Sequence, residues 1–166
     1  MAVIDVRPMA ADDDPAIYGR IVREAYLALP GYPEDPEYDD DLARVTERAA
    51  HGTIVVATCD GAPAGCLTFV DDPSSELAEF TDPDSTSIRM FGVDPRLHGM
   101  GIGAAMLEWC IDATRRLGRP RLCLHTLEPM SRAMRLYERF GFVRRPDLDE
   151  DFGGIIGMAF VLDVSP

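Results

Sequence analysis

Hydrophobic residues along this chain recur at two different spacings, which indicate where strands and helices lie. Residues 3–7 alternate between apolar and polar side chains as a strand does. Acidic residues then precede Pro15, a pattern typical of a helix start, and apolar residues follow at helical spacing to about Leu29. The segment "PGYPEDPEYDDD" (residues 30–41) is rich in proline and acid and is expected to be a loop. A second helix is expected from about Asp40 to Ala50.

The middle of the chain has the pattern of strands joined by tight turns. One strand is predicted at Thr53–Cys59 and another at Ala64–Val70, with Asp60 and Gly61 forming the turn of a hairpin. An acidic loop over residues 71–85 separates this hairpin from a further strand at Thr86–Val93.

The rest of the chain combines two helices with three strands. A helix follows a glycine-rich loop and ends near Leu117, and a strand is predicted at residues 120–126. A short helix is expected from about Ser131 to Phe140, and the last strands form a hairpin across an acidic loop. This order predicts an α/β fold, a single domain over residues 1–166 with a mixed sheet of about six to seven strands flanked by about four helices.

Composition narrows the classes of function. The formal net charge of −13 argues against a nucleic-acid partner, because phosphate binding needs a basic surface. No apolar run is long enough to cross a bilayer, so no membrane partner is expected. The four cysteines have no CxxC pairing and are expected to be buried thiols of a cytoplasmic protein. The histidines have no ligand-like spacing with these cysteines, so no metal is expected.

The glycine-rich stretch "HGMGIG", residues 98–103, lies between a predicted strand and the start of a predicted helix. Such a junction concentrates unpaired backbone N–H groups at the positive end of the helix dipole. Glycines at 99, 101 and 103 would let those groups converge on a phosphate without obstruction by side chains. The spacing fits neither a Walker loop nor a dinucleotide fingerprint. Alone, it is equally compatible with a glycine-rich turn that binds nothing.

Two segments resemble signatures of the GCN5-related N-acetyltransferase (GNAT) family. "RMFGVDPRLHGMGIGAAML" resembles the family's acetyl-CoA-binding signature, in which a strand ending in valine leads to a glycine loop and a helix. "AMRLYERFGF" resembles the second signature, Ala-x-x-Leu-Tyr-x-x-x-Gly-Phe. Both occur in the family's order and separation, and the predicted element order matches across nearly the whole chain.

The resemblance implies a splayed sheet that binds acetyl-CoA as cosubstrate for acetyl transfer to an amine. It assigns the cofactor's pantetheine to the backbone of one strand, Met90, Phe91, Gly92 and Val93. It assigns the pyrophosphate to the loop residues Gly99, Met100, Gly101, Ile102, Gly103 and Ala104. It makes Tyr137 the general acid that protonates the leaving thiolate, since a phenol with its ordinary pKa of about 10 is protonated at neutral pH. Simple core packing is the competing interpretation of Tyr137.

Two positions depart from the family pattern. His98 stands where the family usually has arginine or glutamine, and a neutral imidazole supplies no charge beside the phosphates. Many members carry an asparagine at the position of Met130, and the neighbouring Ser131 is a substitute polar contact for the pantetheine.

The general base is less well defined by the resemblance. The family's strand glutamate has no counterpart between Thr86 and Val93. His125, on the strand facing the cleft, has a suitable ordinary pKa of about 6.5, although a purely structural histidine is the alternative. Acids of the preceding loop could act through water: Glu79, Asp82 and Asp84.

The acceptor is expected to be a small cationic amine. The wall formed by the first two helices and their connector carries Tyr32, Glu34 and Tyr38 among other acids, and aromatic and carboxylate groups suit an ammonium ligand. A solvated acidic loop is the alternative for this wall. A protein N-terminus or lysine side chain is the second acceptor class, and a non-catalytic acyl-CoA sensor is a different function altogether. The resemblance also allows a homodimer, for which no residue of this sequence argues.

Overall fold

The computed structural model describes residues 1–80 and 82–165. Within these residues, eight strands form a sheet. Seven follow the order β1-β2-β3-β4-β5-β8-β6, and the eighth, β7, pairs with β8. The strands are β1 (Ile4–Pro8), β2 (Thr53–Cys59), β3 (Ala62–Val70), β4 (Ser85–Val93), β5 (Arg121–Thr126), β6 (Val143–Arg144), β7 (Glu150–Asp151) and β8 (Ile156–Asp163). Neighbouring strands are antiparallel except for β4 and β5, which are parallel.

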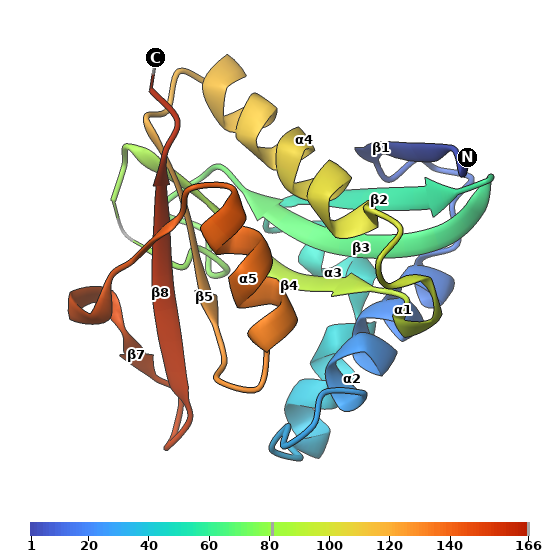
Figure 1. Ribbon diagram of the computed structural model, residues 1–166, viewed down its shortest axis with the longest axis horizontal. Helices are drawn as coiled ribbons and strands as arrows, with labels where there is room; N and C mark the ends of the chain where they lie inside the picture. The colour runs from blue at the N-terminus through green and yellow to red at the C-terminus, as the bar shows by residue number, and fades with distance from the viewer. Residues whose placement is uncertain (81, 166) are drawn as a thin grey trace.

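Helices cover both faces of the sheet, as Figure 1 shows. They are α1 (Pro15–Leu27), α2 (Pro36–Ala43), α3 (Val45–Arg48), α4 (Ile102–Arg116) and α5 (Ser131–Arg139), with 3-10 turns η1 (Pro95–Leu97) and η2 (Pro146–Leu148). One buried cluster packs α4 and α5 against the sheet, and a second packs α1 and α2 against the other face. The fold is the mixed α/β fold that the sequence predicts. No described helix is both long and apolar enough to span a membrane.

The second helix was predicted in the wrong place. The structure has α2 at Pro36–Ala43 and a separate short α3 at Val45–Arg48, where the sequence pattern indicates a loop to residue 41 and one helix from Asp40 to Ala50. Asp35 caps α2 by accepting a hydrogen bond from the Tyr38 backbone N–H, and Pro36 occupies the first turn. Proline and acids therefore start a helix here, because both are favourable at helix N-termini.

The two halves of the sheet separate where β4 meets β5. Only Ser85–Ser87 pair with Arg121–Cys123, and beyond these residues the strands diverge (Figure 1). A buried hydrogen bond of 2.6 Å between the Thr86 and Thr114 hydroxyls lies beside this junction and ties β4 to α4. The C-terminal half of β4 is therefore not hydrogen-bonded to β5.

A β-bulge in β4 changes which face its side chains occupy. Thr68 of β3 pairs with Arg89 and Cys66 pairs with Gly92, so Met90 and Phe91 lie opposite Leu67 alone. Met90 has a positive φ of 52°, as the extra residue of a bulge requires an unusual backbone. Strict alternation would place Met90 on the face of Ile88, yet Met90 packs in the α1–α2 cluster and Ile88 in the α4–α5 cluster.

Candidate active site

A cavity of about 730 Å³ opens between the diverging strands. It runs from the glycine loop, along the C-terminal half of β4, to the helices α1 and α2 on one side and β5 with α5 on the other. This volume lies within the range of small-molecule and cofactor sites. The part of β4 that does not pair with β5 thus forms one wall of a cavity that could hold an elongated ligand.

The glycine loop at one end of the cavity has the backbone of an anion site. Gly99 and Gly101 have φ values of 85° and 86°, which favour glycine strongly. Gly101 is the N-cap of α4 and no side chain caps the helix, so its first-turn N–H groups are available to a ligand. Gly101, Ile102, Gly103 and Ala104 all line the cavity. Backbone N–H groups at a helix N-terminus suit a phosphate-bearing group.

Two other glycines lie close to neighbouring elements. A Cβ on Gly92 would lie 2.8 Å from the Val22 Cα, so glycine at this position lets α1 approach β4 closely. A Cβ on Gly103 would lie 3.3 Å from the Leu136 Cδ2, a contact that a small shift of the leucine side chain would relieve. Packing therefore explains glycine at position 92 before any ligand is considered, but does not require it at position 103.

Tyr137 lines the cavity from α5 and is buried, with 5% of its surface exposed. Its ring packs against Phe142 and Phe160, with centroid distances of 5.5 and 6.1 Å. Burial raises the pKa of Tyr137 above its ordinary value, so the hydroxyl is protonated at neutral pH. The side chain is therefore part of the core and also lines the cavity as a protonated phenol.

His125 and Glu79 form a buried pair deeper in the cavity. The His125 Nδ1 lies 2.7 Å from the Glu79 Oε2, and the His125 Nε2 lies 3.0 Å from the Leu148 carbonyl oxygen. The carbonyl can only accept, so Nε2 carries a proton, and Nδ1 shares a hydrogen bond with the Glu79 carboxyl group. Burial lowers the pKa of His125, but the hydrogen bonds to Glu79 and Leu148 and the nearby carboxylates outweigh it and leave that pKa raised. The raised pKa favours the imidazolium form of the ring, in which both nitrogens donate.

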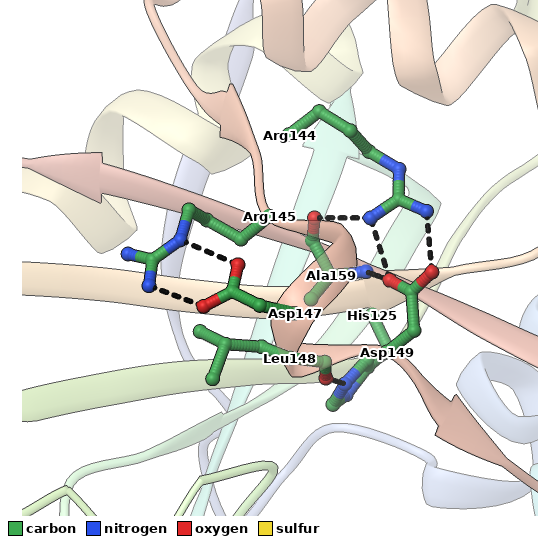
Figure 2. A network of polar contacts seen from close by, with 7 residues as sticks. All are labelled: His125, Arg144, Arg145, Asp147, Leu148, Asp149 and Ala159. Carbon is green, nitrogen blue, oxygen red and sulfur yellow. Dashed lines mark hydrogen bonds and ion pairs between the residues drawn. The ribbon is translucent and has the colours of Figure 1, made fainter.

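The loop that holds the Leu148 carbonyl is fixed by arginine–aspartate pairs, shown in Figure 2. The Arg144 guanidinium donates to both oxygens of Asp149, which also accepts a 2.9 Å hydrogen bond from the Ala159 N–H. Arg145 makes a similar two-point contact with Asp147. Bidentate contacts of this kind fix the relative orientation of the two side chains and also stabilise the pair. They hold the η2 turn, and with it the carbonyl that faces His125.

The wall on the α1–α2 side is aromatic. Tyr26 makes edge-on contacts with Tyr32 and Tyr38, at centroid distances of 5.9 and 6.4 Å. The Tyr32 hydroxyl donates a 2.9 Å hydrogen bond to Asp39, which orients its ring. Asp35 adds a carboxylate at the rim. Arg89 of β4 also lines this end of the cavity, with its Nε 3.8 Å from the Glu79 Oε1.

Most of the residues that the sequence singled out line this cavity. They are Tyr32, Tyr38, Glu79, Met90, Phe91, Gly92, Val93, His98, Gly99, Gly101, Ile102, Gly103, Ala104, His125 and Tyr137. Five others do not line it: Met100, which is 42% exposed, the exposed Glu34 and Ser131, and Asp82 and Asp84 of the loop before β4. Met130, and not Ser131, lies along the wall.

Several residues of the site were not singled out from the sequence. Tyr26, Arg89, Met130 and Phe152 line the cavity. Arg89 had a recognisable signal, since it is the one charged residue of the strand "TSIRMFGV". Phe152 had none, because its position depends on how the acidic C-terminal loop folds back over β5.

One group of side chains has the composition of a metal site. Ligand atoms of Glu79, His125 and Glu150 lie within 4.8 Å of one another. Both nitrogens of the His125 ring are already hydrogen-bonded to Glu79 and Leu148, so an ion would have to break one of these bonds. The arrangement is better described as a hydrogen-bonded pair than as a metal centre.

Comparison of whole structures identifies the class of fold. The structure of yncA from Salmonella typhimurium with its cofactor acetyl-CoA aligns with a TM-score of 0.68, at 20% identity, over 98% of this chain and 94% of that chain. A GCN5-related N-acetyltransferase from Kribbella flavida aligns with a TM-score of 0.70, at 20% identity, over 96% and 97% of the two chains. The fold is therefore that of the acetyltransferases.

Sequence comparison assigns the family. The model of the acetyltransferase (GNAT) family matches residues 19–142, and the chain belongs to that family. An uncharacterized N-acetyltransferase of Schizosaccharomyces pombe is 28% identical over 107 residues, which cover 63% of this chain and 61% of the relative. The chain thus matches somewhat less than two thirds of that relative's length.

Proposed function

We propose that this protein transfers an acetyl group from acetyl-CoA to a primary amine. The observation that carries the proposal is the cavity itself, which joins a glycine loop suited to phosphates to a buried carboxylate and a protonated phenol. Membership of the acetyltransferase family and a fold like that of yncA with acetyl-CoA support the choice of cofactor.

The chain's own groups fit acetyl-CoA along the length of the cavity. The first-turn N–H groups of α4 would hold the pyrophosphate, because no side chain caps that helix. The backbone of β4 beyond Ser87 has no hydrogen bonds to β5 and would pair with the pantetheine amides. Acetyl-CoA supplies a thioester whose carbonyl carbon is attacked by the amine, so that a C–N bond forms and the C–S bond breaks.

Two proton transfers complete the reaction. We assign acceptance of the amine proton to Glu79, which brings a carboxyl group into the cavity, rather than to His125, whose two ring nitrogens are both engaged in hydrogen bonds, with Glu79 and with the Leu148 carbonyl. Tyr137 donates its proton to the leaving sulfur, since its raised pKa keeps it protonated until the thiolate forms. The ammonium group of an amine suits the acceptor end, where Tyr32 and Tyr38 are combined with the Asp35 carboxylate.

The direct test is release of CoA thiol from acetyl-CoA in the presence of a panel of small amines and peptides. Thiol release that depends on the amine, with the acetylated product identified by mass spectrometry, is the expected result. Tight binding of acetyl-CoA without release on any amine or peptide would contradict the proposal and favour an acyl-CoA sensor.

The substitution Tyr137→Phe tests the general acid. It removes the hydroxyl but keeps the ring that packs against Phe142 and Phe160. We expect kcat to fall by about 10²- to 10⁴-fold, the usual contribution of general acid catalysis, with the acetyl-CoA dissociation constant nearly unchanged. An unaltered kcat would refute the role.

The substitution Glu79→Gln tests the general base. We expect a loss in kcat of about 10²-fold or more, because the amide cannot accept the amine proton. The matched control is Glu76→Gln in the same loop, whose side chain is 84% exposed. Equal kcat values of Glu79→Gln and Glu76→Gln would exclude Glu79 as the base. A loss of kcat in His125→Gln but not in Glu79→Gln would assign the role to His125 instead.

A further inference from the structure

Arg89 has a hydrogen-bonding capacity that the fold does not use. Its side chain lines the cavity and is 25% exposed, while its Nε approaches Glu79 only to 3.8 Å. No hydrogen bond joins this guanidinium to any part of the chain that the structure describes, residues 1–80 and 82–165. A guanidinium has five N–H donors in a fork that matches a carboxylate. Other arginines of this chain, such as Arg144 and Arg121, donate hydrogen bonds from their guanidinium groups to aspartates.

Alternation along β4 determines where this group points. Ile88 packs in the α4–α5 cluster, so its neighbour Arg89 lies on the opposite face, toward Tyr38, and the bulge that follows keeps Met90 on that face as well. Arg89 also precedes Val93 by four residues, about 13 Å along a strand, and the glycine loop lies further on. The guanidinium is therefore at the acceptor end of the cavity and too far from the loop to serve a pyrophosphate held there.

The acceptor end thus has a guanidinium that is ion-paired with a carboxylate but keeps its hydrogen-bond donors free in the described chain. Arg89 and Glu79 lie next to each other, with 3.8 Å between Nε and Oε1. An α-amino acid has the complementary pair, a carboxylate and an ammonium group attached to one carbon. A carboxylate on the Arg89 fork would bring the amine to Glu79, the group assigned above as proton acceptor. An amine far from its carboxylate could not reach both groups in this way.

We infer that the acceptor is an α-amino acid, bound through its carboxylate by Arg89 and with its amine at Glu79. The inference rests on the proposed acetyl transfer and names the acceptor class for it. A net-neutral zwitterion also suits a protein with a net charge of −13, which would repel a purely anionic acceptor. The rings of Tyr26, Tyr32 and Tyr38 bound the space left for the amino acid's side chain.

The test compares acceptors that differ only in the carboxylate. The twenty standard L-amino acids, their α-amides, the decarboxylated amines and short peptides are assayed for thiol release from acetyl-CoA. For the best amino acid, we expect kcat/KM to exceed that of its amide and its decarboxylated amine by about 10- to 100-fold, the range for hydrogen bonds to a charged group. In Arg89→Gln this preference should disappear, while Arg89→Lys keeps part of it.

The control is Arg20→Gln on α1, whose side chain is 66% exposed. It should leave the preference unchanged, and an unaltered acetyl-CoA dissociation constant in Arg89→Gln confirms that this variant is folded. Equal or faster acetylation of amides, amines or peptides by the wild type overturns the inference but leaves the proposed function intact. The inference is also overturned if Arg89→Gln slows amino acids and amides by the same factor. Absence of thiol release with every acceptor overturns both.

Discussion

At the scale of single residues, His125 shows how hydrogen bonding can outweigh burial. Its side chain is only 4% exposed, an environment that disfavours a charged imidazole. Yet Glu79 and Leu148 each present an oxygen to one ring nitrogen, and Phe80 stacks on the ring at a centroid distance of 4.7 Å. Both ring nitrogens of a histidine that the sequence offers as a base are thus engaged in hydrogen bonds.

This arrangement predicts a pH dependence of stability. Because the pKa of folded His125 is raised above its unfolded value of about 6.5, its stabilising contribution is complete below that pH and is lost as pH rises through the folded pKa. The difference in unfolding free energy between wild type and His125→Gln should therefore shrink between pH 6 and pH 9. Urea unfolding at several pH values measures it.

The control for this experiment is His51→Gln, because the His51 side chain is 40% exposed and its nearest carboxylate oxygen is 3.8 Å away. We expect little change in stability with pH for this variant relative to wild type. A difference between wild type and His125→Gln that grows with pH would contradict the imidazolium assignment.

Positions at the cavity were predictable from the sequence where a motif surrounds them. Tyr137 and the glycines at 99, 101 and 103 line the cavity, and each belongs to a recognisable signature. The pairing of Arg89 with Glu79 depends on a loop that brings Glu79 beside β4 and β5, and no local pattern in the sequence indicates that contact. Long-range contacts of this kind determine the acceptor end of the site.

At the scale of elements, the start of α4 combines backbone strain with ligand binding. Gly101 adopts a φ of 86°, so alanine there is expected to cost about 1–2 kcal/mol of stability. Gly101→Ala should also weaken acetyl-CoA binding, because relief of the strain would move the first-turn N–H groups. Thermal unfolding and calorimetric titration with acetyl-CoA measure the two effects.

Gly61 offers a matched control for Gly101. It has a similar φ of 82° and open space around its Cα, but it lies in the β2–β3 turn away from the cavity. Gly61→Ala should lose a similar amount of stability and keep its affinity for acetyl-CoA. If both variants lost affinity equally, the geometry of the loop would have no special role in binding.

Element positions were predictable where the local pattern was unambiguous. The strand predicted at Thr53–Cys59 is confirmed without change, because its apolar run ends at a strong Asp-Gly turn. The helix α2 was missed because its residues, "PEYDDDLA", have few apolar positions, and only Leu42 and Asp39 are buried. Its stability comes from capping and from packing on α1, where Gly19 lets the two helices touch.

At the scale of the whole molecule, charge is strongly unbalanced. With a formal net charge of −13, repulsion among carboxylates opposes the compact state, whereas the surface ion pairs each contribute little. Salt should therefore stabilise this protein by screening repulsion. We expect the midpoint of thermal unfolding to rise by a few degrees when NaCl is raised from low millimolar to about 0.15 M, the range over which the Debye length shortens most.

A variant with fewer acids provides the control for this effect. Replacing the exposed Glu34 and Glu128 by glutamine should raise the midpoint at low salt and reduce its response to NaCl. A midpoint that falls with added salt would show that ion pairs, such as Arg7 with Asp13, outweigh the repulsion.

The junction between β4 and β5 has a consequence for hydrogen exchange. Three residue pairs are the only backbone pairing between the half-sheet β1–β4 and the half-sheet β5–β8 in the described chain. The α4–α5 cluster packs on both half-sheets, but the edge of β4 that faces β5 can open locally. The amide hydrogens beyond Ser87 on β4 that do not bond to β3 should exchange with solvent much faster than those of β2. A ligand lying between the diverging strands would bridge both half-sheets, and hydrogen exchange would then slow along this edge.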